Sequence, residues 1–225
     1  MGGQGKVGRQ VRAWYSGDAV AVASPDLSKR DRLSVRGPVA ELAPLVERVL
    51  AEVGTSFRPF GDEQVIRELA ERVPGMSFTA TFGWMDTADT ATLPTQTAKT
   101  VWLQGDSGVE ELLAEASPDS YAWPGRTGVL RWAAATSDAG ELLSIAADAW
   151  SAPEVGFLAG VATRPDVRGR GLSQQVCAFV TAELVKRHGT CALMVDAGNA
   201  AAIAVYEKLG YTYRGVAAAS VEPSS

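Results

Sequence analysis

The chain has 225 residues, of which 46% are hydrophobic and 21% charged, a composition typical of a globular protein and not of a disordered one. Its formal net charge of −5 argues against nucleic acid as the main partner, because phosphate backbones attract an excess of positive charge. The longest apolar run, at 200–206, has seven residues, whereas a membrane-spanning helix needs roughly 20. No membrane association is therefore predicted.

Few residues are available for metal or nucleophilic chemistry. The chain contains one histidine, His188, and two cysteines, Cys177 and Cys191. These numbers exclude the usual histidine and cysteine zinc sites, Ser-His-Asp triads and Cys-His pairs, so no metal is expected. The first ten residues contain no apolar segment of a secretory signal, and we predict a cytoplasmic protein.

The sequence is predicted to divide near residue 105. Residues 1–105 carry 12 basic and 12 acidic side chains, and the Thr-rich segment 86–104, a predicted connector followed by a short strand, precedes the boundary. Hydrophobic periodicity in this first part predicts an α/β lobe with helices at 39–53 and 61–73 and strands at 18–23 and 76–83. Its role is unknown, because its carboxylates follow helical spacing beside arginines and look like solvated surface.

Residues 106–225 carry 9 basic and 14 acidic side chains and show a more regular pattern. We predict helices and strands alternating in a mixed, mostly antiparallel sheet with flanking helices, one crossover being parallel. The expected helices are 109–116, 171–188 and 200–209, and the expected strands are 129–135, 141–150, 155–163, 190–196 and 211–216. Gly210 is expected to end the last helix in a left-handed conformation.

The most informative segment is Val161–Ser173, with the sequence VATRPDVRGRGLS. A predicted strand ends at Thr163, and the residues Arg168, Gly169, Arg170, Gly171, Leu172 and Ser173 open the following helix. The first N–H groups of a helix lack intrahelical partners, and glycines let the backbone approach a diphosphate closely. Gln174 replaces the third glycine of a dinucleotide fingerprint, and no Walker A sequence is present. The segment is either a phosphate site or a glycine-rich turn with solvated arginines.

Two segments together resemble the GNAT superfamily of N-acetyltransferases. The first, with Arg168, Gly171 and Ser173, is similar to the Q/R-x-x-G-x-G/A acyl-CoA pyrophosphate motif, with Ser in place of the final Gly or Ala. The second, from Asn199 to Tyr211, is similar to N-x-x-A-I-x-x-Y-E-K-x-G-[FY]. The resemblance covers roughly residues 106–216, and 1–105 contains no matching motif. We interpret the first lobe as a degenerate relative of the second that shapes the acceptor site or an interface.

The resemblance implies an N-acetyltransferase that uses acetyl-CoA as co-substrate and transfers the acetyl group directly to a primary amine in a ternary complex. It implies that the amides of Arg168, Gly169, Arg170, Gly171, Leu172 and Ser173 hold the pyrophosphate. Val161 and Thr163 would bind the pantetheine arm, with an N–H near Val161 as oxyanion donor, and Asn199 would contact the pantetheine or only cap its helix.

Tyr206 is the predicted general acid that protonates the leaving thiolate, and its alternative role is core packing beside Ile203 and Leu209. Glu154 and Asp148 are candidates for the general base through water, with Asp196 as a further one, although each also fits a surface charge. Tyr121 and Trp123 are expected either to line the acceptor site or to pack.

The acceptor is expected to be a small-molecule or peptide amine, with a cationic amine favoured by the acidic second part, and the protein a monomer or homodimer. Two other functions remain open. A non-catalytic acyl-CoA sensor would bind the ligand without turnover, and a nucleotide-binding or scaffold domain would show no preference for CoA over ATP.

Overall fold

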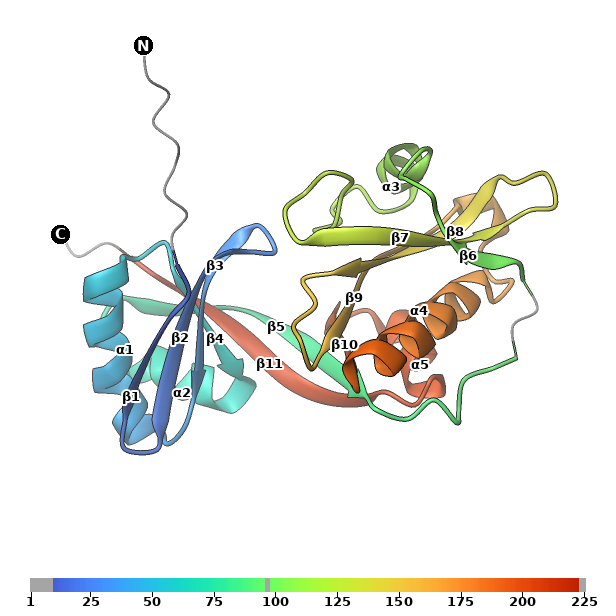
Figure 1. The fold of residues 1–225 in the computed structure, drawn as a ribbon. Coiled ribbons are helices and arrows are strands. Elements are labelled where there is room, and N and C mark those ends of the chain that lie inside the picture. Colours follow the sequence, from blue (N-terminus) through green and yellow to red (C-terminus); the bar gives the residue numbers. More distant parts are fainter. Residues whose placement is uncertain (1–9, 96–97, 223–225) are drawn as a thin grey trace, which may run out of the picture. The chain divides into compact units, whose positions relative to one another are not determined.

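The computed structural model describes residues 10–95 and 98–222. Their strands are β1 Arg12–Ser16, β2 Ala19–Leu27, β3 Arg30–Arg36, β4 Arg58–Asp62, β5 Met76–Thr87, β6 Thr100–Trp102, β7 Val129–Thr136, β8 Leu142–Ala149, β9 Gly156–Thr163, β10 Cys191–Asp196 and β11 Thr212–Val221 (Figure 1). Their helices are α1 Val39–Val53, α2 Glu63–Arg72, α3 Val109–Ala116, α4 Leu172–His188 and α5 Ala200–Lys208, with a 3₁₀ turn η1 at Pro165–Val167. The predicted α/β fold with a mixed, largely antiparallel sheet is confirmed.

The helices form where an apolar stripe and a cap coincide. Helix α1 buries a stripe at three- and four-residue spacing, Leu42, Leu45, Val46, Val49 and Leu50. Helix α2 is capped by Asp62, whose Oδ1 accepts from the N–H groups of Gln64 and Val65 at 3.0 and 3.3 Å. The positive φ of Gly210, 85°, confirms the predicted left-handed residue that ends α5.

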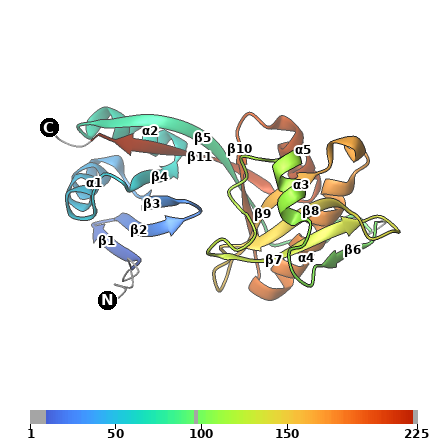
Figure 2. The same cartoon turned by 90° about the horizontal axis from the view of Figure 1, so that it is seen from above.

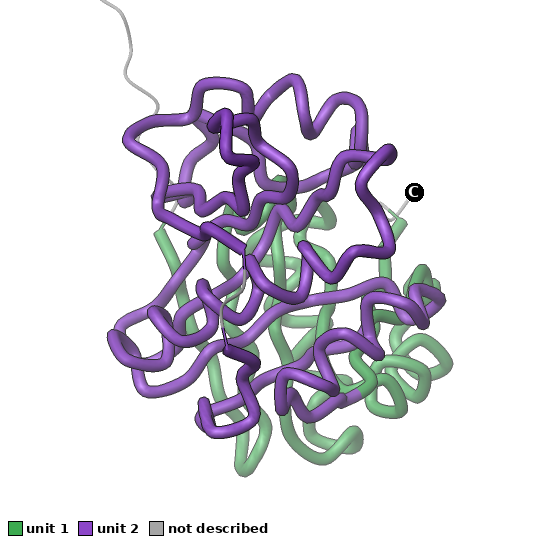
Figure 3. Tube along the Cα trace, turned by 90° about the vertical axis from the view of Figure 1, so that its right-hand side faces the viewer, with its two compact units in different colours: residues 1–82, 215–225 green, residues 83–214 purple. Residues whose placement is uncertain are grey.

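The described chain forms two compact units (Figure 3). Unit 1 consists of residues 1–82 and 215–225, and unit 2 of residues 83–214. The predicted boundary near residue 105 lies inside unit 2, because β6 in the expected connector pairs with β7. Strands β5 and β11 each have residues in both units, so the chain passes between the units within strands and not through a loop.

In unit 1, strands β1, β2 and β3 are antiparallel neighbours, and β3 pairs with β4 in parallel across α1. Strand β11 pairs antiparallel with the other edge of β4. Helices α1 and α2 cover one face of this sheet, and their apolar residues share a core with Leu33, Ala217 and Ala219 (Figure 2).

In unit 2, β6, β7, β8 and β9 are antiparallel neighbours, and β9 pairs with β10 in parallel across α4. Strand β5 is the other neighbour of β10. Two separate cores lie on the two faces of the sheet: one contains residues of α4 and α5, and the other residues of α3. The figure shows α3 on one face and α4 and α5 on the other (Figure 1).

The two units repeat one order of elements. In unit 1, three antiparallel strands lead into a crossover helix, a parallel strand, a second helix and β5; in unit 2, β7, β8 and β9 lead into α4, β10, α5 and β11. In each unit the parallel strand has as its outer neighbour the last strand of the other repeat, β11 beside β4 and β5 beside β10. The units differ at the crossover, since two residues connect β3 to α1 and eight connect β9 to α4.

No described helix is both long enough and apolar enough to span a membrane. Residues 1–9, where no secretory signal was found, lie outside the described residues.

Candidate functional site

The parallel strands β9 and β10 separate after two residues. Their pairing is recorded for Gly156 with Cys191 and for Phe157 with Ala192, although β9 continues to Thr163 and β10 to Asp196. Along the rest of its length β9 pairs only with β8 among the described strands. One backbone edge of β9 therefore has free hydrogen-bonding groups in the direction of its C-terminal end.

The free edge of β9 includes the two residues predicted to contact a pantetheine arm. The N–H of Arg164 donates to the carbonyl of Leu143 at 3.0 Å, next to β8. Because backbone groups alternate along a regular strand, the N–H of Thr163 points away from β8. Val161 lies two residues earlier, in the part of β9 that is not paired with β10. The structure thus brings Val161 and Thr163 to the free edge, while the Thr163 hydroxyl bonds to Ser144 Oγ at 2.8 Å.

A β-bulge interrupts β9 at its centre. Ile145 pairs with Ala162 and Ala147 with Ala159, so one residue of β8 stands opposite two of β9 between these pairs. Gly160 lies in this bulge with φ of +61°, and an added Cβ would lie 2.6 Å from the Trp132 ring. Sequence reasoning missed Gly160, although a glycine inside an apolar strand is the usual signal of a bulge.

The predicted phosphate cradle begins where β9 ends. Gly169 and Gly171 have φ of +77° and +75°, and nothing lies within 4 Å of a Cβ added to either one. Helix α4 has Gly171 as its N-cap and lacks a side-chain cap. The first recorded backbone bond of this helix is from Gln175 N–H to the Gly171 carbonyl, so the N–H groups of 169–173 have no acceptor among the described residues.

The Arg168 side chain fixes the cradle to its neighbours. Its Nε donates to the carbonyl of Thr163 at 3.2 Å, and its Nη2 donates to the carbonyl of Ala116, at the end of α3, at 3.1 Å. Arg168 thus links the last turn of α3 to the end of β9. Arg164 is paired with Asp166 at 2.7 Å, whereas Arg170 is exposed and has no ion pair with a described residue.

Tyr206 on α5 is 7% exposed and packs among the residues of α4 and β10. Its ring centroid lies 5.8 Å from that of Tyr211, and its hydroxyl makes no hydrogen bond with a described residue. Burial, with the Cys177 and Cys191 thiols nearby, raises the pKa of the Tyr206 hydroxyl well above its usual value of 10. Tyr206 therefore stays protonated and free to donate, and it also packs in the core.

Asp148 on β8 is fully buried and both of its carboxylate oxygens are engaged. Oδ2 accepts from Arg131 Nε at 3.2 Å, and Oδ1 accepts from Ser151 Oγ at 2.6 Å. The same Ser151 oxygen accepts from the N–H of Phe157 at 2.8 Å. This network ties the turn after β8 to the first residues of β9, which is a structural task distinct from proton removal.

We therefore expect Asp148→Asn to lower the free energy of unfolding by about 2–3 kcal/mol, because a buried ionic hydrogen bond is lost. Urea unfolding at pH 7 measures this difference. Asp138→Asn, at an exposed position in the β7–β8 turn, is the control and should change stability by less than about 0.5 kcal/mol. Equal stability of the two variants would contradict the structural assignment.

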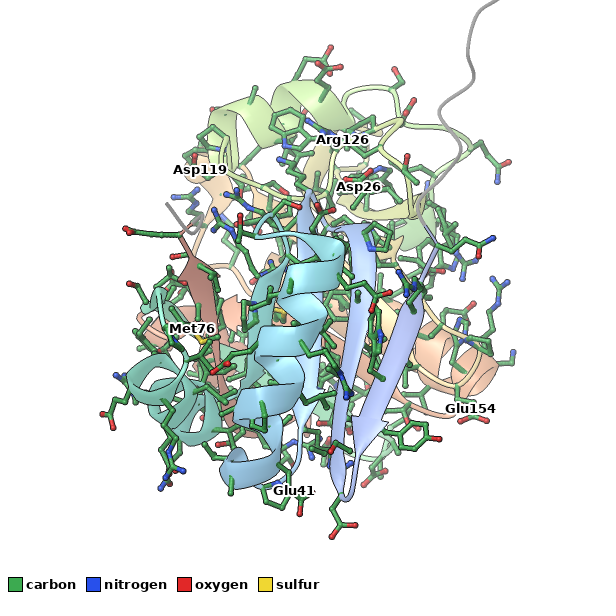
Figure 4. The ribbon with its side chains drawn as sticks, turned by 90° about the vertical axis from the view of Figure 1, so that its left-hand side faces the viewer. Asp26, Glu41, Met76, Asp119, Arg126 and Glu154 are labelled. Carbon is green, nitrogen blue, oxygen red and sulfur yellow. The ribbon has the colours of Figure 1, made fainter. Side chains whose placement is uncertain are left out.

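The other predicted residues occupy three different settings. Glu154 is exposed in the β8–β9 hairpin, without an ion pair to a described residue (Figure 4). Asn199 caps α5, its Oδ1 accepting from the N–H of Ala202 at 3.1 Å. In the loop after α3, Tyr121 is 42% exposed, whereas Trp123 packs against the α3-side core and donates from Nε1 to the Ser120 carbonyl at 2.7 Å.

Comparison with known proteins supports the predicted resemblance. The family model described as FR47-like protein matches residues 138–218, which include the bulge, the cradle and Tyr206. No curated protein sequence matches the chain.

Several solved structures share the fold over almost the whole chain. A GCN5-related N-acetyltransferase from Kribbella flavida is 19% identical, with a TM-score of 0.63, and the match covers 96% of this chain and 90% of that one. A GNAT-family acetyltransferase from Colwellia psychrerythraea is 15% identical, with a TM-score of 0.56 and coverage of 92% and 84%. A GCN5-related N-acetyltransferase from Sphaerobacter thermophilus is 17% identical, with a TM-score of 0.54 and coverage of 92% and 82%. These matches confirm the predicted fold.

Proposed function

We propose that this protein is an N-acetyltransferase that transfers an acetyl group from acetyl-CoA directly to a primary amine. One observation carries the proposal: a run of backbone N–H groups at 169–173, without acceptors in the part of the chain that the structure describes, adjoins the unpaired edge of β9. Together they offer a phosphate cradle followed by a strand edge, which suits a ligand with a diphosphate at one end and an amide-containing arm behind it.

The chain's own residues would divide the binding of acetyl-CoA between them. The amides of Gly169 through Ser173 would hold the pyrophosphate, Arg170 would add charge, and Val161 and Thr163 would pair with the arm. The N–H of Arg168 donates to the Pro165 carbonyl at 3.4 Å, so Arg168 would contribute to the cradle through its side chain. Asn199 keeps its side chain as a helix cap, so its contribution to the arm would come from its other donors. Unit 1 has no equivalent cradle, because only Gly37 and Pro38 stand between β3 and α1.

The proposed reaction needs an oxyanion donor, an acid and a base. The amine nitrogen attacks the thioester carbon, and a bulge N–H near Val161 donates to the oxygen. As the C–S bond breaks, Tyr206 gives its proton to the departing thiolate, and a base removes the proton of the attacking nitrogen. Glu154 is the better base candidate, because its carboxylate is exposed and unpaired while both oxygens of Asp148 are engaged.

We further propose a cytoplasmic protein acting on a small-molecule or peptide amine as a monomer or homodimer, without nucleic acid. The two cysteines, Cys177 and Cys191, are both free and buried, which suits a reducing compartment.

Thermal unfolding with acetyl-CoA tests the proposal first. Ligand at about 100 times Kd should add about 2.7 kcal/mol of stability, which raises Tm by about 5–10 °C for a chain of this size. ATP at the same concentration is the control and should leave Tm nearly unchanged. Calorimetric titration should give one acetyl-CoA per chain, since only unit 2 has the cradle. An equal shift with ATP, or none with acetyl-CoA, would contradict the proposal.

A non-catalytic acyl-CoA sensor remains the second candidate, favoured by the burial of Tyr206 in the core. It predicts the same shift with acetyl-CoA and no release of CoA with any amine.

A further inference from the structure

Three aromatic side chains of unit 2 form a cluster: Trp84 on β5, Trp150 directly after β8 and Phe157 on β9. The ring centroids of Trp84 and Phe157 are 5.8 Å apart, and those of Trp150 and Phe157 are 6.3 Å apart. All three side chains are half-buried, so part of each ring stays accessible. We refer to Trp84, Trp150 and Phe157 as the aromatic cluster.

Trp150 is held in a conformation that bulky residues seldom adopt, with φ of +57°. Its N–H donates to the Gly128 carbonyl at 2.6 Å and its Nε1 to the Thr127 carbonyl at 3.2 Å. The backbone of Gly128 packs closely against the Trp150 ring, because a Cβ added to Gly128 would be 2.3 Å from Trp150 Cδ1. Such over-determined strain is characteristic of functional positions.

The aromatic cluster lies on the same face of β9 as the bulge. Ala159, two residues after Phe157, packs against the core that contains the residues of α3. A Cβ added to Gly160 would point at Trp132 of the same core. The bulge follows Phe157 by three residues, which corresponds to about 10 Å along a strand. An acceptor whose amine reaches the bulge can therefore place its other end on the cluster.

The net charge of unit 2 and the uncovered rings of the cluster favour a cation. Elsewhere in the described residues arginines lie over the rings of Trp14, Phe60, Phe78 and Trp102. No cation of the described residues lies over the three rings of the cluster. Unit 2 carries 10 basic and 15 acidic side chains, and unit 1 is balanced.

From these observations we infer that the acceptor is a diamine or polyamine, and that the aromatic cluster binds its distal ammonium group. This inference rests on the proposed acetyl transfer. The ring faces attract the cation, and the proximal amine, in its neutral form, is the nucleophile at the bulge. Trp84, Trp150 and Phe157 are then specificity-determining residues.

The test compares 1,5-diaminopentane with pentylamine, which has the same length without the second charge. Binding to the full chain in the presence of CoA is measured by calorimetry, and acetylation separately by CoA release. A cation over aromatic rings should make the diamine bind about 3- to 30-fold more tightly than pentylamine. Trp84→Leu and Phe157→Leu should each remove most of this preference. They should do so by weakening the binding of the diamine while leaving the affinity for pentylamine unchanged. Trp84→Phe should keep much of it.

Trp14→Leu in unit 1, where an arginine covers a half-buried tryptophan, is the matched control and should keep the preference. Equal affinity for the two amines, or an equal loss of both in Trp84→Leu, would overturn the inference. Tighter binding of phenethylamine than of the diamine would also overturn it, in favour of an aromatic acceptor. The binding measurement does not depend on turnover. Diamine binding that depends on Trp84 but is not followed by acetylation would contradict the proposed acetyltransferase function and still support the cation site.

Discussion

Replacing Tyr206 with phenylalanine is expected to lower kcat by about 100-fold or more, because the departing thiolate loses its proton donor. The fold should survive the change. The Tyr206 hydroxyl is buried without a hydrogen bond to a described residue, so its removal leaves no partner unsatisfied. Kd for CoA should stay unchanged, since the cradle lies on another helix. Steady-state kinetics with calorimetric binding measures both quantities.

Tyr211→Phe is the matched control for this variant. The Tyr211 hydroxyl bonds to Thr181 Oγ1 at 2.7 Å and to Cys191 Sγ at 3.0 Å. Its loss should lower the free energy of unfolding by about 1–3 kcal/mol, with kcat nearly unchanged. If Tyr206→Phe retains full activity, Tyr206 is a core residue and another group is the acid.

The pH dependence should separate Tyr206 from the other groups. Burial raises the pKa of both Tyr206 and Tyr211 well above 10. Both phenols are therefore protonated below pH 10, and no loss of activity in that range should come from them. Their contribution to stability is complete below the unfolded pKa of about 10 and decreases as pH rises above it toward the folded values.

Gly160→Ala should damage both stability and chemistry. The positive φ is unfavourable for alanine, and its Cβ would stand 2.6 Å from Trp132 and 3.1 Å from the Ala122 Cβ. Together these effects should lower the free energy of unfolding by about 3 kcal/mol. Because the bulge aims the proposed oxyanion donor, kcat should also fall by about 100-fold in the protein that remains folded.

Gly140→Ala provides the comparison for Gly160→Ala. Gly140 has φ of +86°, and nothing lies within 4 Å of an added Cβ. It therefore carries the backbone strain without the clash, and should lower the free energy of unfolding by about 1 kcal/mol with full activity. Urea unfolding measures the stability of both variants, and initial rates measure their kcat. An equal decrease of kcat in Gly160→Ala and Gly140→Ala would contradict the role of the bulge.

The elements that bury a periodic apolar face were predictable from the sequence. Helices α1 and α3 begin and end where the spacing of Val and Leu predicted. Strands β1, β3 and β4 were missed because their sequences RAWYS, RDRLSVR and RPFGD show little apolar alternation. These strands form because their neighbours in the sheet supply the pairing, which no local pattern reports.

The candidate site divides in the same way. The cradle could be predicted because it depends on local backbone freedom, and Gly169 and Gly171 do adopt positive φ. The aromatic cluster joins Trp84 and Phe157 from two strands with Trp150 from the turn after β8, so it depends on tertiary packing. Nor does any local signal mark the positive φ of Trp150, because bulky residues avoid it.

The passage of β11 into unit 1 has a consequence for the order in which the protein can be made. Ala217, Ala219 and Val221 belong to the core of unit 1, whose other residues precede position 79. A ribosome therefore completes all of unit 2 before it releases the strand that pairs with β4. During that interval the nascent first unit has an open sheet edge, which is prone to pairing with foreign strands. Maturation thus runs against the usual direction, in which the N-terminal part is finished first.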